Sequence, residues 1–147
     1  AAACREAGAA LVFVHGGRLS EQEAAGVGAF HAAAFLPYRS ALAHASLCIT
    51  HGGSNTVLDA LACGVPLLVR PVGFDQPGNL ARVRHHGLGE ELSSLRRPSV
   101  IARQIRRLVG DAGMKARCES VSRALAAAGG AARAAEVVEG ELRWVGV

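Results

Sequence analysis

Two short apolar runs joined by a helical segment constrain the fold of this chain most strongly. Residues 46–50, "SLCIT", and residues 65–70, "VPLLVR", are rich in leucine, isoleucine and valine. The second run is apolar on both faces, as strands of a parallel sheet covered by helices are. Between them, residues 54–63 place apolar side chains on one helical face, and Gly64 follows as a helix stop. A strand, a helix and a strand with short connections predict a parallel α/β unit with a right-handed crossover.

The same alternation continues along the chain and predicts one domain over residues 1–147. The predicted fold class is α/β, with a Rossmann-like parallel sheet flanked by helices. The chain lacks an initiator Met, so we expect a fragment whose opening strand lies upstream of Ala1. Besides the segments above, strands are predicted at 10–15 and 30–35, with a possible edge strand at 88–92, and helices at 1–8, from Ser20, at 39–45, 76–87, 99–109, 112–128 and 130–142.

Composition narrows the class of protein. Half of the 147 residues are hydrophobic and 19% are charged, which is typical of a globular chain with a sizeable core. No apolar run approaches the roughly 18 residues of a membrane span, and the N-terminus lacks the plan of a signal peptide. The cysteines are dispersed, and Cys48 and Cys63 are predicted to be buried, reduced thiols. These features predict a cytoplasmic protein without a membrane span.

A basic cluster raises the question of nucleic-acid binding. The net charge is +4, and arginines gather between residues 96 and 107. Apolar residues at helical spacing leave the last three arginines on the opposite face of a helix. No aromatic residue interleaves with them to stack on bases. We therefore predict a solvated helix face and no nucleic-acid partner for Arg96, Arg97, Arg103, Arg106 and Arg107.

Polar clusters follow three of the predicted strands. They are "FLPY" at 35–38, "THGGSNT" at 50–56 and "PVGFDQ" at 71–76. In open α/β sheets, ligands bind beyond the carboxyl ends of the strands. The three clusters are therefore predicted to outline one cleft.

The central cluster has the chemistry of an anion site. Gly52 and Gly53 permit a tight turn and close backbone approach. Residues 54–56 supply capping groups and open N–H groups at a helix start, where the helix dipole favours negative charge. His51 adds a side-chain donor. A plain strand–helix turn with a well-made cap and a histidine satisfied by backbone explains the same residues equally well. The segment matches neither a Walker loop nor the dinucleotide fingerprint.

Three further polar residues suit a hydroxyl-rich ligand. Asp59 lies one turn into the helix, where it could accept hydrogen bonds from a ribose, or it could be an exposed helix residue. Asp75 and Gln76 together accept and donate hydrogen bonds, as sugar hydroxyls require. Asp75 could instead be only the N-cap of the next helix. No cluster has metal-ligand spacing, and adjacent His85 and His86 are predicted to be solvated.

The segment from Phe35 to Gln76 resembles the donor-binding signature of nucleotide-sugar-dependent glycosyltransferases of the GT-B architecture. The similarity is greatest to bacterial macrolide, antibiotic and zeaxanthin glycosyltransferases, with plant and animal UDP-glycosyltransferases further off. "THGGSNTVLDALACGVPLLVRPVGFDQPGNLARV" follows the family pattern nearly throughout. The helical remainder fits the C-terminal half of such enzymes, so the resemblance covers essentially the whole chain.

The resemblance implies a role for each polar residue. The transferred sugar would be held by Asp75 and Gln76. The ribose and base would meet Asp59, where the family often has a glutamate, together with Phe35 and Tyr38, which stand where plant members have tryptophan and glutamine. The pyrophosphate would be held by His51, Gly53, Ser54, Asn55 and Thr56.

The implied reaction moves a hexose from a UDP- or dTDP-sugar to an acceptor hydroxyl, without a metal or other cofactor. In this family the acceptor site and the general base belong to an N-terminal domain, which we expect to lie outside this chain. No catalytic residue is therefore assigned, and His15 is either a turn residue or a part of the donor cleft. The alternatives are a stand-alone donor-binding subunit of a split glycosyltransferase and a GT-B-like sugar-nucleotide epimerase.

Overall fold

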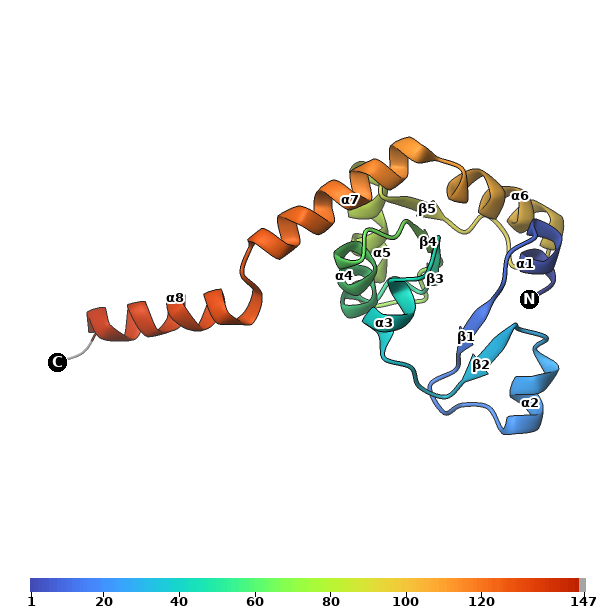
Figure 1. Cartoon of the computed structure of the whole chain (residues 1–147), viewed down its shortest axis with the longest axis horizontal. Coiled ribbons are helices and arrows are strands. Elements are labelled where there is room, and N and C mark those ends of the chain that lie inside the picture. The colour runs from blue at the N-terminus through green and yellow to red at the C-terminus, as the bar shows by residue number, and fades with distance from the viewer. Residues whose placement is uncertain (146–147) are drawn as a thin grey trace.

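The structure, a computed structural model, describes residues 1–145 and alternates helices with short strands (Figure 1). The strands are β1 (Val12–Val14), β2 (His31–Ala33), β3 (Cys48–Thr50), β4 (Leu67–Val69) and β5 (Gly89–Glu91). The helices are α1 (Ala2–Ala7), α2 (Glu21–Gly26), α3 (Tyr38–Leu42), α4 (Ser54–Ala62), α5 (Gln76–His85), α6 (Pro98–Val109), α7 (Ala112–Ala127) and α8 (Gly130–Val145). Every predicted strand and helix is present, with ends that differ by a few residues.

All strand pairs are parallel, which confirms the predicted fold class, but the strands form two sheets instead of one. One sheet pairs β1 with β2, and the other has the order β3-β4-β5. Strands β1 and β3 each have a neighbour on one side only. Their apolar side chains are consequently open, with Val12 48% and Ile49 43% exposed. The carboxyl end of β2 therefore belongs to a different sheet from the carboxyl ends of β3 and β4.

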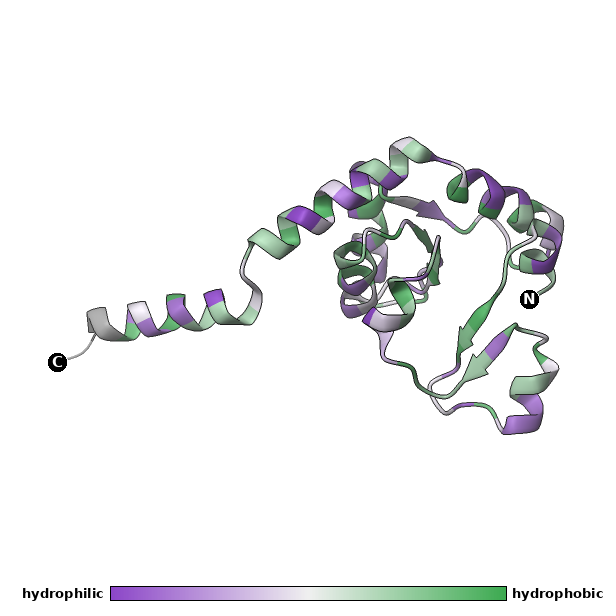
Figure 2. Cartoon of the chain, viewed as in Figure 1, coloured by the Kyte–Doolittle hydropathy of each residue, from purple (hydrophilic) through white to green (hydrophobic). Residues whose placement is uncertain are grey.

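The core is centred on β4. Leu67, Leu68 and Val69 are fully buried, because β3 and β5 flank this strand and helices cover it. Helix α7 packs on α4, and α1 packs on α6. Helix α8 extends away from this body and carries exposed apolar residues at Val137 and Val138 (Figures 1 and 2). Among the described residues, no helix combines the length and apolarity needed to cross a lipid bilayer.

The cysteines are all free thiols, but their burial differs from the prediction. Cys48 and Cys63 are only half-buried, whereas Cys4 and Cys118 are buried. The short strand β3 lies at a sheet edge, which leaves Cys48 partly open. Desolvation nonetheless raises the pKa of Cys48 to about 11.

The arginine-rich helix α6 has the predicted solvated face. Arg103, Arg106 and Arg107 are exposed. Arg107 forms an ion pair with Glu90, and the Arg106 guanidinium donates to the carbonyl oxygen of Glu6. These arginines therefore tie α6 to neighbouring elements of the same chain.

One buried amide joins α6 to β5. Gln104 is 8% exposed, and its Nε2 donates to the carbonyl oxygen of Glu91 at 2.7 Å and to a carboxylate oxygen of Glu90 at 3.2 Å. Its Oε1 accepts from the backbone N–H and the hydroxyl of Ser93. Both ends of the amide are thus satisfied.

We expect Gln104→Leu to lower the free energy of unfolding by about 2 kcal/mol, because it leaves the buried partners without hydrogen bonds. Denaturant unfolding measures the change. The matched control is Gln22→Leu on exposed helix α2, which should change stability by less than about 0.5 kcal/mol. Equal effects of the two substitutions would contradict a structural role for the Gln104 amide.

Candidate functional site

The turn between β3 and α4 needs glycine at its second residue, Gly52. Gly52 has a φ of +92°, and its N–H donates to the Thr50 hydroxyl. A Cβ atom on Gly52 would lie 2.6 Å from Cγ1 of buried Val69. The chain therefore turns sharply against the end of β4, as predicted for this position.

The start of α4 presents open N–H groups beside a histidine. Gly53 is the N-cap and no side chain caps it, and the first helical bond of the turn runs from the Val57 N–H to the Gly53 carbonyl. The N–H groups of residues 54–56 precede that bond and have no partner inside the helix. His51 is exposed, and its Nε2 lies 2.7 Å from where a Cβ of Gly53 would be. Backbone donors, the positive end of the helix dipole and an imidazole thus converge on one spot that suits an anion.

The turn before α5 joins this spot through hydrogen bonds. The Ser54 hydroxyl donates to Oδ2 of Asp75 at 2.6 Å, and Asn79 Nδ2 donates to the same oxygen at 2.8 Å. These bonds hold the pKa of Asp75 below its ordinary value. Asp75 occupies the N-cap position of α5 but makes no side-chain cap bond. Its carboxylate therefore faces the α4 turn, and the simple capping alternative does not describe it.

Gln76 shapes the loop in front of α5. Its side chain is buried, and its Oε1 accepts from the N–H of Val72 at 2.7 Å and of Gly73 at 3.1 Å. The loop also places Phe74 at a φ of 58° with its side chain fully exposed. Because the amide oxygen is engaged, the Nε2 group is the part of Gln76 that can meet a ligand.

Of the predicted ribose and base residues, Asp59 and Tyr38 lie where α3 packs on α4, whereas Phe35 lies against the turn after β1. Asp59 accepts a hydrogen bond from Nε of Arg39 at 3.2 Å. Tyr38 is the first residue of α3, which packs on α4. Phe35 is 77% exposed, and its ring lies 3.7 Å from where a Cβ of Gly17 would be, in the turn after β1. The structure thus brings residues 51–56 together with 75–76, and it places Phe35 against the other sheet.

Three histidines predicted to lie outside the site, or at its margin, and two residues that the sequence did not indicate lie around these turns. His15 is a turn residue, because its Nδ1 accepts from the Leu19 N–H at 3.2 Å. His85 and His86 are exposed, as predicted. Sequence reasoning missed Arg39, the partner of Asp59, and Asn79, the partner of Asp75. The only signal for Asn79 was its i+4 spacing from Asp75 on one helix.

Comparison with known proteins identifies the family of this chain. Residues 18–140 match the model of the erythromycin biosynthesis protein CIII-like, C-terminal domain. The chain belongs to this family. These domains are the C-terminal, donor-binding part of glycosyltransferases.

The relatives and structural neighbours of this chain are glycosyltransferases. Zeaxanthin glucosyltransferase of Pantoea ananas is 39% identical over 140 residues, which are 93% of this chain and 32% of that protein. The crystal structure of CalG4, the calicheamicin glycosyltransferase, matches with a TM-score of 0.86 and 33% identity over 99% of this chain and 40% of that chain. Glycosyltransferase VinC in complex with DTDP matches with a TM-score of 0.69 and 25% identity over 83% of this chain and 32% of that chain. This CIII-like chain therefore spans about a third of the length of the relatives it matches.

We expect Gly52→Ala to destabilise the CIII-like domain by roughly 1–3 kcal/mol, because its Cβ meets Val69 and the positive φ is strained. The control is Gly78→Ala in α5, where the nearest atom to a Cβ is an Arg82 nitrogen at 3.8 Å. This control should raise stability by about 0.5–1 kcal/mol. Thermal unfolding of both variants checks the prediction, and a Gly52→Ala protein as stable as the parent would show that the turn does not need glycine.

Proposed function

We propose that this chain is the donor-binding part of an enzyme that transfers a hexose from a nucleoside-diphosphate sugar to an acceptor hydroxyl. The observation that carries the proposal is the juxtaposition of two turns. Open N–H groups and His51 at the start of α4 lie beside Asp75, which accepts a hydrogen bond from Ser54. One turn can hold an anion and the other can hold a neutral, hydroxyl-rich group next to it.

The anion in this proposal is the diphosphate. Transfer breaks the bond between the anomeric carbon and the diphosphate oxygen, so negative charge builds on the leaving group. Backbone N–H groups that already point at that position stabilise the charge without reorganising. The N–H groups of Ser54, Asn55 and Thr56 are in this arrangement, with Gly53 allowing close approach and His51 adding a donor. In this proposal the helix start and the imidazole suffice for the charge, without a metal.

The sugar end uses Asp75 and Gln76. Asp75 Oδ2 is occupied by Ser54 and Asn79, so Oδ1 is the oxygen that would accept from a sugar hydroxyl. Gln76 Oε1 is occupied by two backbone N–H groups, so Nε2 would donate. The Ser54 hydroxyl is engaged by Asp75, so in this proposal Ser54 would meet the phosphate through its backbone N–H, which also lies within reach of the Asp75 carboxylate.

The nucleoside end uses Asp59, Phe35 and Tyr38. Asp59 is held by Arg39, and its other carboxylate oxygen would accept from the ribose diol. Exposed Phe35 and Tyr38 offer aromatic faces for the base. The VinC complex with DTDP supports a nucleoside diphosphate such as dTDP as the ligand, and UDP is the other nucleotide that we propose.

Transfer also requires an acceptor site and a general base. We place both outside these 147 residues, since the chain spans about a third of its relatives and His15 is engaged by the Leu19 N–H. The isolated chain is thus expected to bind donor and to transfer little. All the relatives named above are glycosyltransferases, which disfavours an epimerase.

We expect His51→Ala to weaken binding of UDP and of UDP-glucose by the same factor, about tenfold, because it removes a hydrogen bond to a charged group. Asp75→Ala should weaken UDP-glucose about tenfold and leave UDP nearly unchanged. Isothermal titration calorimetry measures both ligands, with dTDP and dTDP-glucose as a second pair.

The matched control is His44→Ala, an exposed histidine after α3, which should alter neither affinity. If the parent binds none of these nucleotides, the proposed function is wrong. If Asp75→Ala weakens UDP as much as UDP-glucose, the division into a diphosphate end and a sugar end is wrong.

A further inference from the structure

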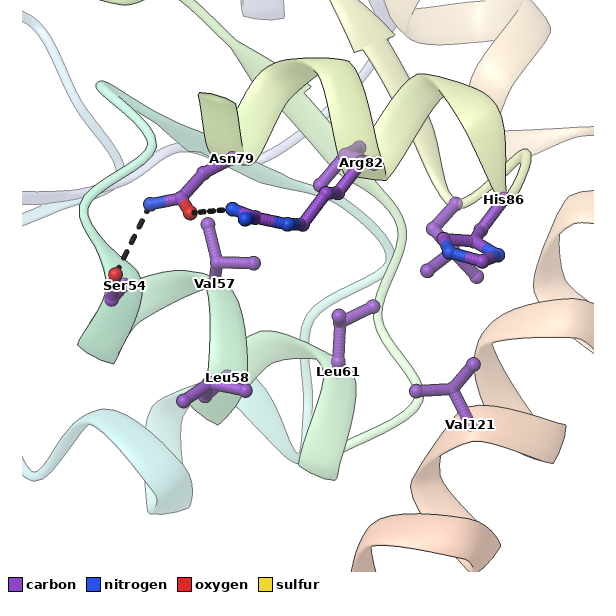
Figure 3. A pocket seen from close by; sticks show the side chains of 10 residues that line it. Ser54, Val57, Leu58, Leu61, Asn79, Arg82, His86 and Val121 are labelled. Carbon is purple, nitrogen blue, oxygen red and sulfur yellow. Dashed lines mark hydrogen bonds between the residues drawn. The ribbon is translucent and has the colours of Figure 1, made fainter. Parts of the chain in front are cut away.

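One side chain contacts both turns of the candidate site. Asn79 lies in α5, four residues after Asp75, and points toward the start of α4 (Figure 3). Its Nδ2 lies 2.8 Å from Oδ2 of Asp75, 2.9 Å from the carbonyl oxygen of Gly52 and 3.2 Å from Oγ of Ser54. Gly52 and Ser54 belong to the turn after β3, and Asp75 belongs to the turn after β4.

The number of hydrogens on the Asn79 amide nitrogen limits how many of these contacts can be full hydrogen bonds. An amide nitrogen carries two hydrogens. The two shortest contacts use one hydrogen each, one toward Asp75 and one toward Gly52. Ser54 Oγ, the most distant of the three acceptors, shares one of these hydrogens. Ser54 in turn gives its own hydroxyl hydrogen to Asp75. Both donor hydrogens of Asn79 are thus used, and they go to different turns.

The opposite end of the amide fixes its orientation. The guanidinium of Arg82, one turn further along α5, lies 3.5 Å from Asn79 Oδ1 (Figure 3). A flipped amide would direct its oxygen at the carboxylate of Asp75 and the carbonyl of Gly52, which are both acceptors. The orientation with nitrogen toward the turns is therefore the one that all four neighbours favour.

We infer that Asn79 is a positioning residue that couples the diphosphate end of the site to its sugar end. The inference rests on the proposed function, and it assigns Asn79 no contact with the donor. By holding Asp75 against the Gly52 carbonyl, Asn79 keeps Oδ1 of Asp75 directed at a sugar whose diphosphate lies at the start of α4. Without the amide, Ser54 alone holds Asp75, and the carboxylate can turn about that one bond.

A positioning role and a general structural role predict different effects on the binding of UDP and of UDP-glucose. A residue that only stabilises the fold affects UDP and UDP-glucose alike. A residue that positions Asp75 affects the extra affinity that the glucosyl group contributes. This extra affinity is measured by the dissociation constant of UDP divided by that of UDP-glucose. The ratio therefore separates the two roles.

The experiment compares the parent with Asn79→Leu, which keeps the approximate volume and removes both donors. Calorimetry with UDP and UDP-glucose gives the ratio of dissociation constants, which should fall about tenfold in Asn79→Leu while UDP binding stays within about threefold. Asn79→Asp, which keeps the shape, should lower the ratio at least as far and serves if the leucine variant does not fold. The control is Arg84→Leu, an exposed arginine on the same helix that takes no part in the hydrogen bonds of Asn79, and it should leave the ratio unchanged.

A measurement without ligand runs in parallel. Carbon-detected NMR titration of the Asp75 carboxyl in the parent and in Asn79→Leu reports the hydrogen bond directly, and the pKa of Asp75 should rise when the Asn79 donor is lost. An unchanged Asp75 pKa, or an unchanged ratio of dissociation constants, overturns the positioning role while the proposed function stands. Failure of the parent to bind either nucleotide overturns the proposed function, and the positioning role for a sugar falls with it.

Discussion

Strand β4 determines where the two turns of the candidate site meet. Its three residues are fully buried, and parallel pairing sets Thr50 of β3 level with Val69 of β4. The chain therefore leaves both strands at the same edge of the sheet, and the turns that follow start side by side. Gly52 completes the arrangement, because only a residue without a Cβ can pass so close to Val69. The site is thus a consequence of strand register and one glycine.

The two turns then divide the chemistry between them. The α4 turn offers backbone donors and an imidazole, and the α5 turn offers a carboxylate and one amide nitrogen. A carboxylate beside an anion site would oppose the anion, but Asp75 has two hydrogen-bond donors on the oxygen that faces α4. Those donors offset its charge on that side and lower its pKa. Electropositive and electronegative groups can therefore stand next to each other and hold a ligand that is charged at one end and neutral at the other.

Local patterns in the sequence predicted most of the elements, because apolar runs, helical periodicity and glycine stops act over short distances. The helix at 54–63 and the glycine turn before it are examples, and both are confirmed. The division into two sheets could not be predicted, since an apolar run shows that a strand exists but not which strand lies beside it. Val12 and Ile49 belong to such runs and are nevertheless open at sheet edges. The family resemblance supplied the donor-domain expectation that the family match later confirmed.

Side-chain partners in the site were harder to predict than its location. Asn79 reaches Gly52 and Ser54 across two turns whose relative position depends on the register of β3 and β4, and its i+4 spacing from Asp75 is the only local signal for it. Arg39 reaches Asp59 through the packing of α3 on α4, which no local pattern identifies. The orientation of the Gln76 amide likewise depends on the path of the loop at residues 72–73. The positions of Asp75 and Gln76 followed from the strand end before them, whereas which of their atoms are already engaged required the folded chain.

The central claim is that a diphosphate binds at the open N–H groups of α4. Amide proton and nitrogen shifts of the isotope-labelled chain, followed by NMR during titration with inorganic pyrophosphate, test it most directly. The largest changes should fall on the backbone amides of Ser54, Asn55 and Thr56, with the His51 ring shifting alongside them. Changes concentrated instead on the arginines around β5 and α6, with residues 54–56 unmoved, would contradict the account.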